Sequence, residues 1–217
     1  MFLGHYAVAF AAKRIAPQVS LGTLLGAALF LDLIWPLFLL LGWERVKIDP
    51  GNTAFTPLDF VSYPYSHSLA TTMLWAALCG YGYMQYTQDR AGANVVGALV
   101  VSHWLLDALT HRPDLPLYPG SAVFVGASLW DNVAQTLSIE SAMFAAGVTL
   151  YASATQPRDA IGRFALWAFV ALNLVLYFDS AAGPPPPDER TLAWVALAVW
   201  LFPPWAGWFD QHRKYRA

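Results

Sequence analysis

Charged residues are scarce in this chain of 217 residues, of which 12 are Lys or Arg and 14 are Asp or Glu. They make up 12% of the sequence, whereas about 25% is usual in soluble domains. The net charge of −2 argues against nucleic acid as a partner. The only cysteine, Cys79, has no second cysteine with which to form an intramolecular disulfide. Internal repeats are not evident, so a single domain over residues 1–217 is the simplest organisation.

The sequence is instead rich in apolar and aromatic residues, with 57% hydrophobic content, ten Trp and ten Tyr. The mean hydropathy is +0.44. Aromatic residues of this number suit the belts at both membrane interfaces. Six segments approach the roughly 20 residues that cross a bilayer: 20–43, 66–86, 93–110, 137–154, 160–178 and 191–209. We therefore expect an all-α fold, a polytopic transmembrane helical bundle of about six spans, the last interrupted by Pro203-Pro204.

Residues 2–15 form a shorter apolar segment in front of these spans. Its basic residues, Lys13 and Arg14, follow the apolar part, which is the reverse of a secretory signal. We expect this segment to be kept as a short N-terminal half-helix.

The basic residues also predict an orientation. Threading six spans from an inside start places eight Lys and Arg residues on one side and four on the other. The positive-inside rule makes the first side cytoplasmic, together with both termini. The two long connections, 44–65 and 112–136, then lie together outside, where they could form a lid or substrate rim.

Ionisable residues inside apolar spans are the strongest functional signal. His103, Asp107 and His111 are spaced at i, i+4 and i+8 and fall within about 80° on one helix face. Asp32 lies inside an even more apolar span. A carboxylate at lipid depth costs about 2.5–3.5 kcal/mol on insertion scales, so it usually faces a cavity, a partner or an ion.

The predicted depths of the other ionisable residues bring them close to this face. At a rise of about 1.5 Å per residue, Asp107 lies about 6 Å below the outer end of its span. His67 begins a helix at the outer surface, Glu140 lies one turn inside the fourth span, and His5 rises from the inner face. Neutral imidazoles and carboxylates bind zinc or manganese, and an open coordination position lowers the pKa of bound water toward about 7. We expect one to three divalent ions, zinc foremost and manganese as the alternative.

Four short motifs occur in a recognisable order over residues 1–140: Gly4-His5-Tyr6, Phe30-Leu31-Asp32, Tyr65-Ser66-His67-Ser68-Leu69, and His103-Trp104-Leu105-Leu106-Asp107 followed by Pro116-Leu117-Tyr118-Pro119. Together they resemble the membrane-bound metal-dependent hydrolase family, whose ligand order is similar to that of the soluble zinc-dependent phospholipases C. The resemblance implies a bacterial inner-membrane enzyme that hydrolyses a phosphoester or ester bond of a membrane lipid or lipid-like substrate.

The resemblance also implies roles for individual residues. The metal ligands would be His5, Asp32, His67, His103 and Asp107, with Asp107 as the bridge between ions. Glu140 and His111 would add further ligands, although Thr136 stands where the phospholipase pattern has its last His. Asp32, Asp107 and Glu140 would be the catalytic carboxylates.

Two other classes of function stay open at this point. A proton-coupled transporter also needs intramembrane acids such as Asp32, Asp107 and Glu140, and a broken helix at Pro203-Pro204 suits one. A non-catalytic subunit of a larger membrane complex could instead bind haem through two histidines. A simpler interpretation of Asp32 is a hydrogen bond between packed helices. The sequence gives neither the substrate nor the oligomeric state.

Overall fold

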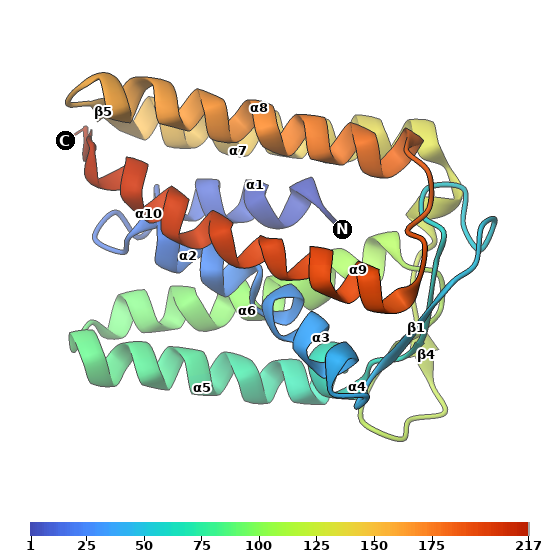
Figure 1. Cartoon of the computed structure of the whole chain (residues 1–217). Coiled ribbons are helices and arrows are strands. Elements are labelled where there is room, and N and C mark those ends of the chain that lie inside the picture. The colour runs from blue at the N-terminus through green and yellow to red at the C-terminus, as the bar shows by residue number, and fades with distance from the viewer. Residues whose placement is uncertain (217) are drawn as a thin grey trace.

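The computed structural model describes residues 1–216 and is mostly helical (Figure 1). The α-helices are α1 (Leu3–Ala12), α2 (Leu21–Ala28), α3 (Phe30–Leu40), α4 (Pro64–His67), α5 (Leu69–Thr87), α6 (Arg90–Thr110), α7 (Val133–Ala154), α8 (Ala160–Ala182), α9 (Glu189–Ala196) and α10 (Phe202–Gln211). Two 3-10 helices complete the set, η1 (Leu129–Asp131) and η2 (Leu197–Leu201).

Short polar side chains begin most of the long helices. Ser68 caps α5 by accepting a hydrogen bond from the Thr71 amide, and Asp89 and Asn132 do the same for α6 and α7. Each such cap satisfies an amide that has no partner within its helix, which contributes about 1 kcal/mol. These caps fix where α5, α6 and α7 start, and with them the depth of the ionisable residues.

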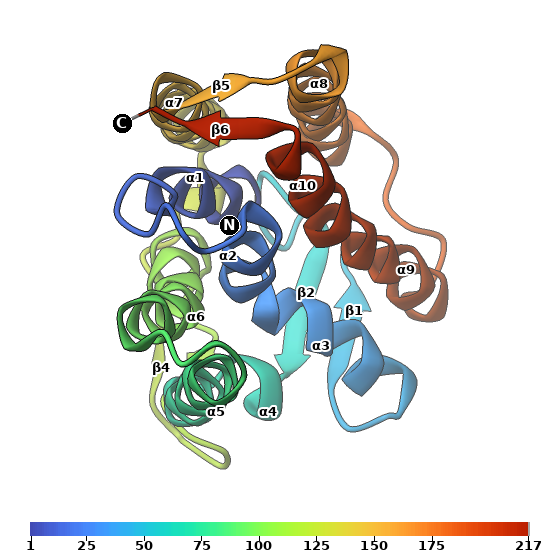
Figure 2. The same ribbon diagram turned by 90° about the vertical axis from the view of Figure 1, so that its left-hand side faces the viewer.

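Helices α1 and α2 lie at the centre of the bundle, as the end-on view in Figure 2 shows. Helix α1 packs against α2, α6 and α7, and eight of its ten residues are buried. A helix that is buried all round is apolar all round, as α1 is apart from His5 and Tyr6. At Gly147 of α7 an added Cβ would overlap the Ala7 carbonyl oxygen, so only glycine allows α1 and α7 to come this close. The predicted N-terminal half-helix is therefore the core of the fold.

The number of membrane spans differs from the expected six. Four helical segments are long and apolar enough to cross a membrane: Arg90–Thr110, Val133–Ala154, Ala160–Ala182 and Glu189–Gln211. Helices α2 and α3 are bent by 54° at Leu29, and this bent pair would make a fifth span. Helix α5, expected as a span over 66–86, is long but less apolar, because Thr, Gly, Tyr and Gln residues dilute its hydrophobic ones. Six spans are not confirmed.

The last span covers Glu189–Gln211, and its α-helix is interrupted near the prolines, as expected, by a stretch of 3-10 helix. Helices α9 and α10 are joined by η2, and Pro203 and Pro204 fall in the first turn of α10. Proline is tolerated there because the first amides of a helix lack an intrahelical acceptor.

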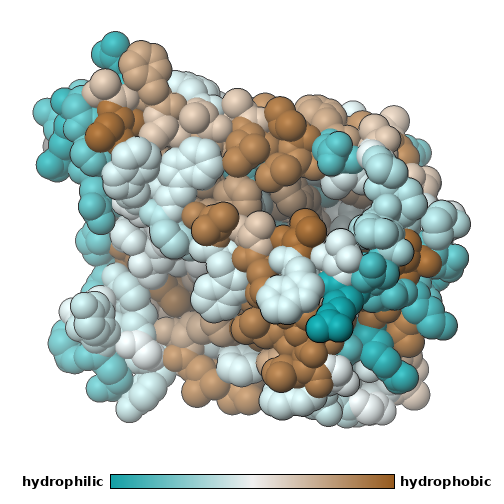
Figure 3. Space-filling model, viewed as in Figure 1, coloured by the Kyte–Doolittle hydropathy of each residue, from teal (hydrophilic) through white to brown (hydrophobic). Residues whose placement is uncertain are grey.

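The outer helices expose large apolar side chains, which supports the assignment to a membrane. Brown patches cover much of the face seen in Figure 3. On α8 the exposed large apolar residues are Ile161, Phe164, Trp167, Leu172, Val175, Leu176 and Phe178. Contiguous apolar surface of this kind is rare on soluble monomers and is stable against lipid. The structure is thus compatible with a multi-pass membrane protein.

Three short antiparallel sheets depart from the all-α expectation. They pair β1 (Arg45–Ile48) with β2 (Leu58–Ser62), β3 (Leu115–Pro116) with β4 (Phe124–Val125), and β5 (Thr155–Pro157) with β6 (Arg213–Tyr215). The first two sheets belong to the long connections 44–65 and 112–136, which lie together at one end of the bundle (Figure 1). The Phe55 amide donates to the Trp130 carbonyl, and Arg112 pairs with Asp59. The expected association of these two connections is confirmed, while the side of the membrane stays a prediction.

Labelling from outside tests that side. In a Cys79→Ala background, we expect an impermeant maleimide to modify Asn52→Cys in the first connection and to leave Gln88→Cys unmodified. The reason is that Gln88 follows α5 at the opposite end of the bundle, on the side given eight basic residues by the sequence. The reverse labelling pattern would invert the topology.

A buried ion pair joins α1 to α10 at the end of the bundle that holds the C-terminus. Lys13 Nζ lies 2.7 Å from Asp210 Oδ2, and Tyr151 donates to Asp210 Oδ1 at 2.8 Å. Replacing Asp210 with Asn should lower the free energy of unfolding by about 3–5 kcal/mol, because the Lys13 ammonium group would stay buried without its counter-charge. Unfolding in detergent measures this loss, and a stability equal to that of the wild type would show that the pair is not essential to the fold.

Candidate metal centre

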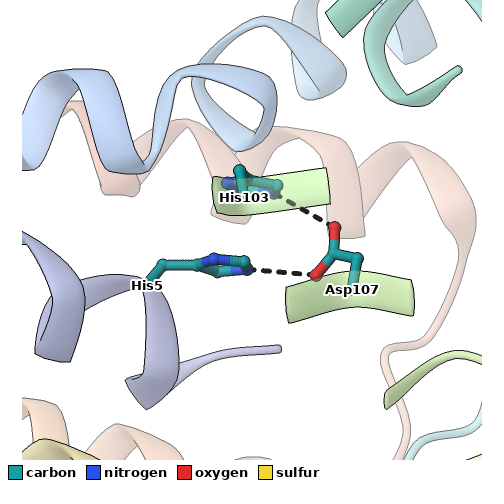
Figure 4. A group of neighbouring side chains, drawn as sticks. All are labelled: His5, His103 and Asp107. Carbon is teal, nitrogen blue, oxygen red and sulfur yellow. Dashed lines mark hydrogen bonds and ion pairs between the residues drawn. The ribbon is translucent and has the colours of Figure 1, made fainter. Parts of the chain in front are cut away.

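Helix α6 provides the central pair of the site. His103 and Asp107 are one turn apart on its buried face, and both side chains are almost completely enclosed. His103 Nε2 lies 3.2 Å from Asp107 Oδ2 (Figure 4). The i, i+4 spacing therefore brings an imidazole and a carboxylate together, as the sequence indicated.

Helix α1 adds His5 from the opposite side. Its Nε2 lies 3.1 Å from Asp107 Oδ1, the other oxygen of the same carboxylate (Figure 4). The rings of His5 and His103 stack with 3.7 Å between their centroids and 5° between their planes. Asp107 is thus shared by two histidines, one on each oxygen. His5, His103 and Asp107 form one group whose ligand atoms all lie within 4.8 Å of one another.

A second group joins the first at His103. It contains His103, Asp32 of α3 and His67 at the end of α4, again with ligand atoms within 4.8 Å. Asp32 Oδ1 lies 3.6 Å from His103 Nε2 and 3.7 Å from His67 Nε2. His67 Nε2 is also 3.7 Å from Asp107 Oδ2. The five residues named first by the sequence therefore converge, although they come from four helices.

The break between α2 and α3 fixes the His103 ring. His103 Nδ1 lies 2.7 Å from the carbonyl oxygen of Ala28, the last residue of α2. A carbonyl can only accept, so Nδ1 carries the proton and the lone pair of the neutral ring is on Nε2. Nε2 is buried, makes no hydrogen bond within residues 1–216, and faces carboxylate oxygens of Asp107 and Asp32 at 3.2 and 3.6 Å. A buried nitrogen lone pair that faces two carboxylates fits a metal ligand.

Glu140, predicted as a ligand and a catalytic carboxylate, contacts the start of α1. Its Oε2 accepts hydrogen bonds from the Phe2 and Gly4 amides at 2.8 and 3.3 Å. A carboxylate at a helix N-terminus is stabilised by free amides and by the helix dipole. Glu140 therefore holds α1, and with it His5, against α7. Both groups found within residues 1–216 leave Glu140 out, so its role as a ligand stays a prediction.

His111, the other added ligand, ends α6 beyond both groups. Its Nδ1 donates to Asp114 Oδ1 at 3.0 Å, and Tyr63 donates to the same oxygen at 2.6 Å. Burial, with Asp114 as the next cause, raises the pKa of the Tyr63 hydroxyl well above its usual value, so Tyr63 stays a donor. This arrangement leaves Nε2 of His111 as the nitrogen available to a ligand.

Thr136, which stands in place of the last phospholipase histidine, donates to the Leu129 and Asn132 carbonyls. Its hydroxyl therefore ties the first turn of α7 to η1. Thr136, Glu140 and His111 thus each contact a different segment, and these contacts do not bring the three together as a third metal site.

Sequence reasoning missed three groups near the site. Glu44 and Ser66 lie behind His67 and are joined by a hydrogen bond of 2.6 Å. The amino group of Met1 contacts Asp107 Oδ1. Glu44 is one of several acids in a polar connection, and no helical or strand periodicity sets it apart. The contact of Met1 could not be predicted because it depends on how α1 packs against α6.

A cavity of about 200 Å³ adjoins the cluster. Asp32, His67, Asp107 and His111 contribute polar groups to its wall. The remaining lining is largely aromatic or apolar and comes from several segments: Met1, Phe2, Trp35, Phe55, Thr56, Leu58, Phe60, Trp130 and Ser180. Figure 3 shows the surface hollowed between α8 and α9, with brown apolar patches above and below the hollow and teal residues toward the end of the bundle. The ionisable groups thus adjoin a pocket with an apolar wall, which suits a partly apolar ligand.

Comparison of the chain with models of known families, with curated proteins and with solved structures gave no match. The resemblance to metal-dependent hydrolases therefore depends on the sequence motifs alone, and the structure adds that five residues of these motifs lie together.

Proposed function

We propose that this protein is a membrane-embedded, metal-dependent hydrolase that cleaves a phosphoester or ester bond of a lipid-like substrate. The observation that supports it best is the convergence of His5, Asp32, His67, His103 and Asp107 into two ligand groups that share His103. Imidazole nitrogens and carboxylate oxygens are the donors that zinc and manganese take. Zinc is the proposed cofactor, with manganese as the alternative.

The chain's own residues divide the work in this proposal. His103 presents its Nε2 lone pair because Ala28 holds the proton at Nδ1. Asp32 and Asp107 supply negative charge to offset a divalent ion, and Asp107 has an oxygen near each of His5 and His103. A bound divalent ion would supply Lewis acidity and lower the pKa of a water molecule toward about 7.

The cavity supports the class of substrate. Its aromatic wall, including Trp35, Phe60 and Trp130, would hold an apolar group and exclude water. His111 contributes a nitrogen on the same wall, and Asp114 fixes which of its nitrogens is protonated. Asp32 keeps 37% of its side chain exposed, so it is the carboxylate most accessible from this space. A lipid head group beside Asp32 with its chains against the aromatic wall fits this distribution.

One alternative is disfavoured by ring geometry. A haem held by His5 and His103 would need the two rings on opposite faces of the porphyrin, but these rings stack directly on each other at 3.7 Å. A transporter would use the same intramembrane acids, and metal content distinguishes it from the hydrolase.

The test begins with metal analysis of the detergent-purified protein. We expect at least one equivalent of zinc or manganese, removal by a chelator, and recovery when the metal is added back. Hydrolysis of a phospholipid in vesicles should follow the same loss and recovery, and a water-soluble phosphodiester should be a poorer substrate. Protein that arrives without metal and binds neither zinc nor manganese would refute the proposal, while tight metal binding without hydrolysis of any ester would leave only the metal centre.

A further inference from the structure

We infer that Glu44 is a positioning residue for the metal centre and acts through Ser66 on His67. This inference rests on the proposed function, because it concerns how one of the proposed ligands is held. Glu44 lies in the connection between α3 and β1, just before Arg45, and is only 2% exposed. An ionised carboxylate that is buried to this extent needs strong hydrogen bonds.

Glu44 receives three hydrogen bonds from one short segment. Its Oε1 accepts from the amides of Tyr65 and Ser66, both at 2.8 Å. Its Oε2 accepts from the Ser66 hydroxyl at 2.6 Å. Bonds to a charged acceptor are about twice as strong as neutral ones. The carboxylate thus determines where α4 starts and also where the proton of the Ser66 hydroxyl lies.

The direction of the Ser66 hydrogen bond has a consequence for His67. Ser66 Oγ lies 2.7 Å from His67 Nδ1, and both side chains are buried. A serine hydroxyl has a single proton. Because Ser66 gives that proton to Glu44, its oxygen can only accept from the imidazole. His67 is therefore protonated at Nδ1, which leaves the Nε2 lone pair toward Asp32 and Asp107.

His67 and His103 are then prepared in the same way by different partners. His103 donates from Nδ1 to a backbone carbonyl, and His67 donates from Nδ1 to a hydroxyl polarised by a carboxylate. Outer partners of this kind fix the tautomer and raise the basicity of a metal-bound histidine, and their loss typically costs about 10–100-fold in affinity or activity. The simpler role for Glu44 is to hold the α4 segment in place through the two amides.

Two variants separate these roles. Ser66→Ala removes the hydroxyl and leaves both amide bonds to Glu44. Glu44→Gln keeps an oxygen for the amides but turns an NH₂ group toward Ser66. Ser66 would then accept from the amide and donate to His67 Nδ1, which moves the proton of the imidazole to Nε2. We therefore expect Glu44→Gln to weaken zinc binding by at least the roughly 10–100-fold typical of such partners, and Ser66→Ala to weaken it less.

The experiment measures zinc affinity by chelator competition and histidine tautomers by ¹⁵N NMR of metal-free protein with labelled histidine, of which the chain has five. Wild-type His67 should be protonated at Nδ1, and Glu44→Gln should move the proton to Nε2. Asp210→Asn is the matched control, because it alters a buried carboxylate at the far end of α1 and should change stability but not zinc affinity.

The outcomes separate this inference from the proposed function. Wild-type protein that binds zinc, together with variants of unchanged affinity and an unchanged His67 tautomer, would overturn the inference and leave the hydrolase proposal intact. Wild-type protein that binds neither zinc nor manganese would overturn the proposed function, and the tautomer of wild-type His67 would still test the role of Glu44. A proton found at Nε2 of His67 in the wild type would end the inference without any variant.

Discussion

Replacement of both His103 and Asp107 by Ala should reduce the bound metal from a stoichiometric amount to background. The reason is their central position: His103 belongs to both ligand groups, and Asp107 lies within 3.7 Å of a nitrogen on His5, His67 and His103. Removing the pair leaves one ligand in the first of these groups and two in the second. Elemental analysis of the purified variant gives the result directly.

His212→Ala is the matched control for this loss. His212 pairs with Asp159 just after α10, at the end of the bundle where α6 begins, whereas His103 and Asp107 lie in the other half of α6 (Figure 1). It should keep the metal content of the wild type. A double variant that retains its metal would place the binding site elsewhere in the protein.

Asp32→Asn should lose metal and turnover while its thermal stability stays near that of the wild type. The amide keeps the shape of the side chain but lacks the charge that offsets a divalent ion. Asp32 is partly exposed to the cavity, so little packing depends on it. If Asp32 only formed a hydrogen bond between helices, asparagine would serve nearly as well.

Leu33→Ala, at the neighbouring position, should have the opposite effect and lower stability without loss of metal. Leu33 is buried in the core, and its truncation should cost about 2–5 kcal/mol of stability with the metal retained. Metal content and phosphodiesterase turnover are measured beside thermal unfolding for both variants. Full metal occupancy and turnover in Asp32→Asn would make Asp32 a structural residue and would leave His5, His67, His103 and Asp107 as the site.

The apolar composition predicted a helical membrane protein, and the structure is compatible with that prediction. The predictions that were wrong concern places where tertiary packing, and not the local sequence, sets the conformation. The segment 20–43 reads as one apolar span, yet the chain bends at Leu29 and the Ala28 carbonyl bonds to His103. Ala28 and His103 are 75 positions apart in the sequence, so a hydropathy profile cannot predict the bond between them.

Those site residues could be predicted whose ionisable side chains lie within apolar segments, where burying them costs free energy. Asp32, His103 and Asp107 stand out for this reason, and the structure brings them together. His5 and His67 were placed near the same helix face by their predicted depths, and the resemblance then implied that they are ligands. Glu44 was missed because an acid in a polar connection has no unusual cost, and only the fold buries it against Ser66. The partners of Glu140 and His111 were equally invisible, since both are set by the contacts of neighbouring segments.

The central place of α1 also governs the order in which the site can be assembled. His5 meets Asp107 across 102 residues of sequence, and Phe2 meets Glu140 across 138. At a synthesis rate of about 5–20 residues per second, the earliest ligand waits roughly 5–20 s for Asp107 to be made, and longer for the helix that holds α1 in place. His5 is thus among the last of the proposed ligands to be fixed, and its group with His103 and Asp107 is complete only after α7 has joined the bundle.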